Sequence, residues 1–413
     1  MSELVANHVR LNKLPDSVLN ALNERISMAV NDNIAPAASL AVFHYDSPIL
    51  DAAWGWLDPQ ERVMPTQTGT LFDLASLTKL YTTVAFLSLI SEEKVYLHSP
   101  LVNIIPEFGE GGMREIGEGQ DPHTKEALPI VDGLSGKKVD PAVINCFHLM
   151  THTSGLPAWR DVYNVANAPI EPPETDSVSR SERWSKAVAK LCSYKFVNLP
   201  EIGVTYSDIG LMLLGEAVAR LHSKSGELDK AIAERVLGDR FSSTVFNPMY
   251  NGFEREQIAP TEEDTTWRKR RVWGEVHDEN ANGVGGVTGH AGLFSTAFEV
   301  GLFGNVWLNH SAKLLKIDPE LAGASVELQA QTENMVRGLG WMLKSPKDSS
   351  AGDLFSPQSY GHTGFTGTSL WIDPKEKLVV AFLTNRVYPG REQPGIHALR
   401  RDIHDIIAEF VHR

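Results

Sequence analysis

The chain has 413 residues, of which 42% are hydrophobic and 22% are charged, a composition typical of a globular protein with one large domain or two intertwined ones. The net charge of −14 argues against a nucleic-acid partner, which requires a basic face, and disfavours docking on anionic lipid. No stretch approaches the ~18 apolar residues of a membrane span and the first residues lack the apolar core of a secretory signal, so we expect a cytoplasmic protein, or a periplasmic or secreted one if a leader has been removed.

The N-terminal part predicts a helix followed by a pair of strands. Apolar residues recur at helical spacing over 15–30. The segments 38–46 and 49–58 are typical of strands, and we expect a tight turn between them at Ser47-Pro48. A further helix is expected from the region of Ser76 to about Ile90.

The middle of the chain predicts helices interrupted by one polar segment. Residues 109–138 are rich in glycine and charge and show no clear period, which indicates a flexible surface insertion that overhangs the cleft. The sequence HLMTHTSGLP predicts a helix end with Gly155 as its left-handed cap. Helices are expected over 181–193 and 206–222.

The C-terminal part predicts an antiparallel sheet. After a glycine-rich loop and a helix near 296–310, four segments alternate like strands, with a hairpin turn at 373–376, and the tail 394–412 has the pattern of an amphipathic helix. Strands therefore occupy both ends of the chain and helices fill the middle. This order predicts an α+β fold, in which one antiparallel sheet flanked by helices is built from both chain ends and a mostly helical domain is inserted.

The first candidate site is Ser76-Leu77-Thr78-Lys79 at the head of an apolar run. Positions i and i+3 share one helix face, the helix dipole favours an anion at Ser76, and burial would lower the pKa of Lys79 so that it acts as a base. The alternative is an ordinary helix start with a solvated lysine. A second copy of the spacing, Ser135 to Lys138, lies in the polar insertion without such a helix.

Two further polar sites accompany it. In Tyr206-Ser207-Asp208, the phenol can shuttle a proton, while Ser207 or Asp208 has the alternative role of helix N-cap. The stretch from His362 through Thr363 and Gly364 to Phe365 could hold a substrate along a strand beside Gly364, with the Phe365 N–H directed at an oxyanion. Its alternative is an edge strand whose glycine admits a neighbouring backbone.

The order and setting of these three motifs resemble the serine β-lactamase and penicillin-binding-protein superfamily, in particular the class C-like branch with its esterases and D-amino-acid peptidases. HLMTHTSGLP and GHTGFTGTSLWIDP also resemble family signatures, so the resemblance covers nearly the whole chain. It implies a β-lactamase/transpeptidase-like fold with one domain from 1–74 and 285–413 and a mostly helical domain over 75–284.

The resemblance also implies roles for the residues. Ser76 would be the nucleophile of an acyl-enzyme, Lys79 its base and Tyr206 a second acid or base. The backbone N–H groups of Ser76 and Phe365 would form the oxyanion hole, and Thr363 would line the strand beside the substrate. No metal or organic cofactor is implied, and the partner is a small ester, amide or peptide substrate. The oligomeric state stays open.

Two positions depart from the common pattern. Asp208 stands where an asparagine is usual and can only accept hydrogen bonds when ionised. His362 stands where a lysine is usual, which removes a fixed positive charge at neutral pH. We therefore expect esters or amides without an essential carboxylate as substrates, as for a carboxylesterase. If a substrate carboxylate is bound, Arg386 or Arg391 would have to hold it.

Three alternatives remain at this point. The first is a D-alanyl-D-alanine carboxypeptidase or β-lactamase acting on cell-wall peptides or β-lactams. The second is a non-catalytic binding relative that retains the fold. The third is metal-dependent hydrolysis through His277, Asp278 and Asn280, whose ordinary interpretation is a loop with polar side chains bound to its own backbone.

Overall fold

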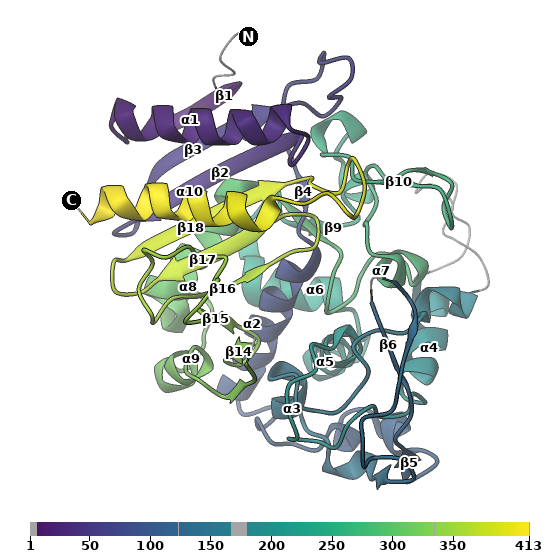
Figure 1. The fold of residues 1–413 in the computed structure, drawn as a ribbon. Coiled ribbons are helices and arrows are strands. Elements are labelled where there is room, and N and C mark those ends of the chain that lie inside the picture. Colours follow the sequence, from purple (N-terminus) through teal and green to yellow (C-terminus); the bar gives the residue numbers. More distant parts are fainter. Residues whose placement is uncertain (1–5, 123, 167–179, 334, 413) are drawn as a thin grey trace.

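The computed structural model describes residues 6–122, 124–166, 180–333 and 335–412. Its main element is a nine-stranded antiparallel sheet, in which strands from the two chain ends lie side by side (Figure 1). In spatial order the strands are β1 (His8–Asn12), β3 (Ser47–Gly55), β2 (Ala37–His44), β18 (Leu378–Thr384), β17 (Ser369–Asp373), β16 (Tyr360–Thr363), β15 (Met342–Leu343), β14 (Val336–Arg337) and β13 (Ala330–Gln331). The predicted α+β fold with a sheet from both termini is confirmed.

The two chain ends meet at the centre of this sheet. Strand β2 pairs with β18 from Ala38↔Thr384 to His44↔Leu378, and nearly all of their side chains are buried. Helices α1 (Asp16–Asn31) and α10 (Ile396–Val411) cover one face, and α8 (Ala297–Leu314) packs on the other (Figure 1). The sheet is therefore the middle of three layers, which explains why its central strands are apolar on both faces.

The other helices form the second half of the molecule below the sheet in Figure 1. They are α2 (Thr78–Ser91), α3 (Cys146–Met150), α4 (Arg180–Leu191), α5 (Asp208–His222), α6 (Leu228–Ile232) and α7 (Glu279–Gly283), while α9 (Pro319–Ser325) lies near β14 and packs on α8 and α2. Helix α2 is buried on every side from Thr78 to Leu89, and it packs on α5. A helix that is apolar all round belongs inside a protein, so the N-terminal end of α2, where Ser76 lies, is held at the centre of the fold.

Smaller sheets accompany the main one. Strand β12 (Leu293–Ser295) pairs with β4 (Phe72–Asp73) and with β9 (Val245–Phe246), and a separate ladder joins β10 (Glu263–Asp264) to β11 (Arg270–Arg271). Because β4 directly precedes Ser76, the β4–β12 pairing fixes the start of the nucleophile turn.

The insertion 109–138 contains more structure than its sequence pattern indicates. It holds two ladders, β5 (Arg114–Glu115) with β8 (Lys138–Val139) and β6 (Gly119–Gln120) with β7 (Ala127–Leu128). Arg114 is buried and donates to the carbonyl oxygens of Cys192 and Tyr194. The flanks of the insertion are therefore anchored to the helical half.

Two local expectations are wrong. The turn between β2 and β3 is at Tyr45-Asp46, both with left-handed φ of 44° and 67°, and Ser47 already belongs to β3. Gly155 is left-handed as predicted (φ 72°), but it does not cap the helix: α3 ends at Met150, and His152 (φ 60°) takes the left-handed position just beyond it. Tertiary contacts decide this, because His152 accepts a hydrogen bond from Ser207, while a Cβ on Gly155 would lie 2.3 Å from the Asn198 carbonyl oxygen.

Within the described residues, no helix combines the length and the apolar character needed to cross a membrane. The limits of the two predicted domains stay a prediction.

Candidate active site

The serine of the first motif lies in a strained turn. Ser76 is the middle residue of a one-turn 3-10 helix, Ala75–Leu77, which runs directly into α2. Ala75 has a φ of 47°, a left-handed conformation that is uncommon for alanine and that clusters at functional sites. The buried carboxylate of Asp73 accepts hydrogen bonds from the backbone N–H groups of Ala75 (2.8 Å) and His277 (2.6 Å). The Asp73 carboxylate thus connects the backbone of this turn to the backbone of His277.

Lys79 is the centre of the polar contacts. Its Nζ donates to Ser76 Oγ at 2.8 Å and to the carbonyl oxygen of His290 at 3.3 Å, and it forms an ion pair of 2.8 Å with Asp208. Only 1% of its side chain is exposed, so the predicted burial is confirmed.

The predicted effect of that burial on the lysine is wrong. Burial alone would lower the pKa of Lys79, but the Asp208 carboxylate, with Tyr206, raises that pKa above the ordinary value. The charged form of Lys79 is therefore favoured in the resting protein, and its catalytic role stays a prediction.

In the second motif, Ser207 and Asp208 have different roles. Ser207 caps α5 by accepting the Gly210 N–H at 3.0 Å, which leaves the Asp208 carboxylate for Lys79. The Tyr206 ring lies 4.8 Å from Lys79 Nζ and 4.6 Å from the ring of His152, and its phenol interacts with the lysine. The cap interpretation therefore applies to Ser207, and Asp208 belongs to the polar cluster.

The third motif is on β16. His362 is 1% exposed, and its Nδ1–H donates to the carbonyl oxygen of Thr363 at 2.8 Å. Burial and the nearby Arg337 lower the pKa of His362 well below its usual value, so the imidazole is neutral, as expected for a residue without fixed charge.

Gly364 lies against the nucleophile turn. A Cβ at this position would be 2.1 Å from Thr368 Oγ1 and 2.6 Å from the Leu74 carbonyl oxygen. The glycine is therefore required by the close approach of the chain's own backbone. The carbonyl oxygen of Phe365 accepts a hydrogen bond from Arg386 Nε. The Phe365 ring stacks on the His277 ring, with 5.7 Å between the ring centres.

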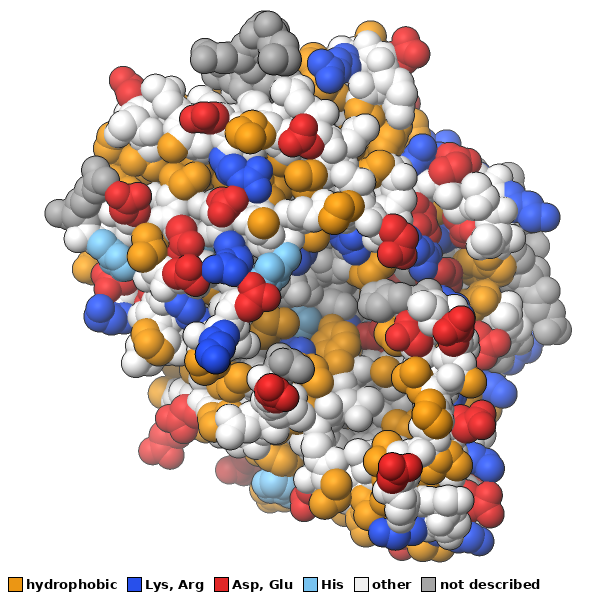
Figure 2. Space-filling view, viewed as in Figure 1, with side chains coloured by type: hydrophobic (Ala, Val, Ile, Leu, Met, Phe, Trp, Pro, Cys, Tyr) orange, Lys and Arg blue, Asp and Glu red, His pale blue; other side chains and the backbone are white. Residues whose placement is uncertain are grey.

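These motifs, distant in sequence, meet around one cavity of about 470 Å³. Figure 2 shows a hollow near the centre of the viewed face, with histidine and basic side chains inside it. Of the residues predicted for the site, those that line the cavity are Ser76, Tyr206, Asp208, His362, Thr363, Gly364 and Phe365, with Lys79 beneath them. Pro122 and Lys125 of the insertion also reach its wall.

The residues of the metal alternative do not converge on one point. Asn280 bonds to the backbone of Tyr163 and Arg160, Asp278 accepts from the Ala281 N–H and pairs with His290 at 3.0 Å, and His277 faces Glu262 at 3.2 Å. Over the described ranges, no group of three metal-ligating side chains forms. His277 and Asp278 line the cavity instead.

Sequence reasoning missed two residues of this site. His152 follows α3 and contacts the second motif, because its Nδ1 accepts a hydrogen bond from the Ser207 N–H at 3.0 Å. Arg337, on β14, lies at the cavity wall with its Nη1 3.5 Å from His362 Nε2. His152 lies within the sequence HLMTHTSGLP, which was interpreted only as a helix end and a family signature, and Arg337 is marked only as the first residue of a predicted strand.

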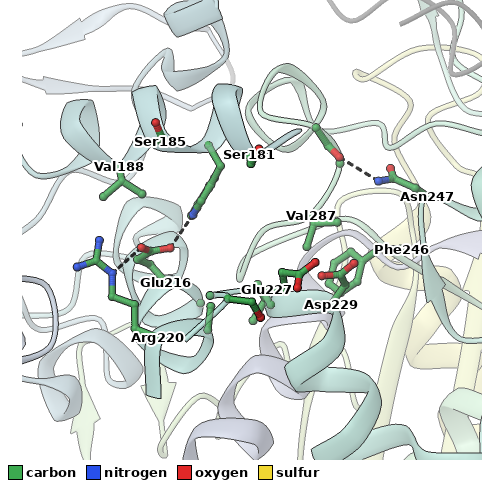
Figure 3. Close-up of a pocket in the computed structure, with 18 of the residues that line it drawn as sticks. Ser181, Ser185, Val188, Glu216, Arg220, Glu227, Asp229, Phe246, Asn247 and Val287 are labelled. Carbon is green, nitrogen blue, oxygen red and sulfur yellow. Dashed lines mark hydrogen bonds and ion pairs between the residues drawn. The ribbon is translucent and has the colours of Figure 1, made fainter. Parts of the chain in front are cut away.

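A larger cavity of about 1210 Å³ lies elsewhere, between α4, α5 and the loop around residue 286 (Figure 3). One of its carboxylates, Glu216, already accepts from Trp184 Nε1 at 2.6 Å and Arg220 Nε at 2.7 Å. None of the predicted site residues lines it, so its size does not make it the active site.

A strained serine turn, a charged Lys79 and a tyrosine around one cavity define a serine hydrolase of the β-lactamase type. Comparison with known sequences agrees, because the model of the Beta-lactamase family matches residues 22–405. The chain belongs to this family, whose members are serine hydrolases.

Individual relatives are similar over most of their length. A protein of Escherichia coli (strain K12) named "Putative D-alanyl-D-alanine carboxypeptidase" is 30% identical over 403 residues, which cover 91% of this chain and 84% of that protein. Among solved structures, EstCE1, a hydrolase with promiscuous acyltransferase activity, superposes with a TM-score of 0.67 at 17% identity, covering 95% of this chain and 98% of that one. A class C β-lactamase superposes with a TM-score of 0.65 at 16% identity, covering 95% of this chain and 98% of that one. At these identities the solved structures establish the fold alone.

Proposed function

We propose that the protein hydrolyses esters or amides through an acyl-enzyme on Ser76. The observation that carries the proposal is the 2.8 Å contact between Lys79 Nζ and Ser76 Oγ at the base of the 470 Å³ cavity. A charged lysine that donates to Oγ orients the oxygen and stabilises negative charge as the O–H bond breaks. Lys79 therefore acts through its charge.

The serine proton then requires another acceptor, and we assign this role to Tyr206. As Oγ attacks the carbonyl carbon, the phenol takes the serine proton while its own hydrogen passes to the leaving oxygen or nitrogen. The C–O or C–N bond breaks, and no charge accumulates on the tyrosine. Water repeats the relay in the second step, returning a proton to Ser76 and releasing the acid.

The tetrahedral oxyanion is assigned to the backbone N–H groups of Ser76 and Phe365. Support comes from the position of β16, whose Gly364 is in close contact with Leu74, two residues before Ser76. This contact holds the two donors on neighbouring segments, where preorganised dipoles are most effective. Thr363 lines the same wall.

A fluorophosphonate probe with mass-spectrometric mapping tests the nucleophile, together with turnover of short p-nitrophenyl esters. Wild type should be labelled on Ser76, and Ser76→Ala should lose both labelling and turnover. The matched control is Ser135→Ala, which removes the serine of the second Ser-x-x-Lys copy from an exposed site in the insertion, and it should behave as wild type. Retained turnover in Ser76→Ala would exclude the assignment.

A second candidate is cleavage of a peptide that ends in D-alanine. The name of the Escherichia coli relative, at 30% identity over 91% of this chain, favours it. Release of free D-alanine from a D-alanyl-D-alanine peptide, compared with ester turnover in the same preparation, decides between the two.

A further inference from the structure

We propose that Arg400 of α10 is a positioning residue for the reaction, because its guanidinium fixes and polarises the peptide unit between Gly364 and Phe365, whose N–H we assign to the oxyanion. This inference rests on the proposed function and adds to it a residue that acts through the backbone. The sequence marks Arg400 only as part of the predicted C-terminal helix.

The guanidinium of Arg400 binds three backbone carbonyl oxygens of one turn. Nη2 donates to the oxygens of Gly364 and Thr368, both at 2.8 Å, and Nε donates to that of Gly367 at 3.3 Å. Arg400 is 7% exposed. Burial first and Arg386 second lower its pKa to about 9, so the guanidinium is charged at neutral pH. A buried positive charge is thus directed at the backbone of the turn that contains Phe365.

One of these bonds reaches the assigned oxyanion donor through a single peptide unit. The Gly364 carbonyl and the Phe365 N–H belong to the same planar, trans peptide. A cation that fixes the direction of this C=O therefore also fixes the direction of the N–H on the opposite side. Hydrogen bonds in a chain polarise one another, and those that involve a charged donor are roughly twice as strong as neutral ones. The Arg400 bond therefore makes the Phe365 N–H a stronger donor.

The turn that Arg400 binds is also bound to the segment before the nucleophile. Thr366 Oγ1 donates to the carbonyl oxygen of Asp73 at 2.7 Å. Thr368 Oγ1 donates to the carbonyl oxygen of Leu74 at 3.0 Å. Both acceptors lie in the segment that leads into the serine turn. Because Arg400 binds the same turn from the side of α10, its contacts determine how the two assigned oxyanion donors lie relative to each other.

The next residue of α10 is an arginine with a different environment. Arg401 pairs with the exposed carboxylates of Asp348 and Asp353, at 2.7 Å and 3.0 Å. Exposed ion pairs of this kind contribute little to stability. Arg401→Met therefore removes a positive charge from the same helix without removing a contact to the turn. It is the matched control for a substitution of Arg400.

The test separates stabilisation of the oxyanion from binding of the substrate. Stopped-flow release of p-nitrophenol from a short ester gives the acylation rate constant and the substrate dissociation constant separately. Phenylboronic acid, which adds to a nucleophilic serine to form a tetrahedral adduct, measures affinity for the oxyanion geometry. In Arg400→Met the acylation rate constant should fall by about 10- to 100-fold, less than the loss of about 10²–10³-fold on removal of an oxyanion donor itself.

The inhibition constant of the boronic acid should rise in parallel, while the substrate dissociation constant stays near its wild-type value. Arg400→Lys, which keeps the charge but loses the fork of donors, should retain part of the rate, and Arg401→Met should behave as wild type. Three results overturn the inference: wild-type acylation in Arg400→Met, an equal loss in Arg401→Met, or weaker substrate binding with an unchanged acylation rate constant. If Arg400→Met does not fold, Arg400→Gln, which has an amide donor but no charge, replaces it with the same expectations.

The failure of the proposed function is distinguishable from the failure of this inference. If wild type shows neither turnover nor labelling of Ser76, the function fails, and NMR still tests the polarised peptide. Glycine labelled with ¹³C at its carbonyl and phenylalanine labelled with ¹⁵N give correlated signals only for the Gly252–Phe253 and Gly364–Phe365 peptides. In Arg400→Gln the Phe365 ¹⁵N signal should move upfield, while the Phe253 signal stays in place. A Phe365 signal that does not move overturns the inference.

Discussion

Lys79 and Asp208 form an ion pair of 2.8 Å, in which 1% of the lysine side chain and 17% of the aspartate side chain are exposed. The pair joins α2, the helix that follows Ser76, to α5, the helix that follows Tyr206. Asp208 raises the pKa of Lys79 against the effect of burial and so favours the charged ammonium. An asparagine at this position would leave the lysine with less support for its charge.

Asp208→Asn should move the alkaline limb of the pH–rate profile. Asp208 raises the pKa of Lys79, so its removal lowers that pKa, and the charged form of the lysine is lost at lower pH than in wild type. If activity requires the charged form, the decline of kcat/KM with rising pH begins earlier in the variant. Profiles of ester turnover between pH 6 and 11 measure this, and an unmoved limb would show that Asp208 does not control the lysine.

Tyr206→Phe removes the phenol and leaves the ring beside Lys79 and His152. We expect kcat to fall by about 10²–10⁴-fold, the usual contribution of one general acid or base. Folding should be unchanged by circular dichroism, because the ring contacts remain. A loss of only a few-fold would assign Tyr206 a structural role and leave the serine proton to another group.

Gly364→Ala should reduce both stability and activity. The new Cβ would meet the Leu74 carbonyl oxygen at 2.6 Å, and backbone cannot move aside cheaply. Overpacking of this kind costs about 1–3 kcal/mol, and it displaces β16 from the nucleophile turn. Thermal unfolding and kcat/KM measure the two effects. Gly69→Ala is the matched control, because a Cβ there has nothing within 4 Å, and wild-type values are expected.

His404 should make the protein sensitive to acid. Burial lowers its pKa to about 4, so the unfolded chain, with an ordinary value near 6.5, binds the proton more readily. Stability is then full above about pH 6.5 and decreases as the pH falls towards 4, by roughly 3 kcal/mol for this group. Urea unfolding at pH 7 and pH 4.5 should show a smaller difference in His404→Leu than in wild type. An identical difference would contradict the role of His404.

The sheet was predictable because local sequence patterns indicate its strands. Alternating apolar segments at both chain ends, together with Asp373, which accepts the N–H groups of Lys375 and Glu376 in the predicted hairpin turn, indicate strands without any knowledge of their partners. The serine and lysine of the first motif were predictable for the same reason, since a spacing of three residues on a helix already places them on one face. The charge state of Lys79 was not, because it depends on Asp208, 129 positions away in the chain.

The sequence by itself thus determined the fold class, the serine and lysine pair and the two other motifs that surround it. Only the tertiary structure decided how these groups are charged and which are left without partners. Arg337 illustrates the reason: its Nη1 lies 3.5 Å from His362 Nε2, although the two residues belong to different strands, β14 and β16, and are 25 positions apart in the chain. Burial and pairing of charges depend on residues that are remote in sequence, so they are properties of the folded chain and no local pattern records them.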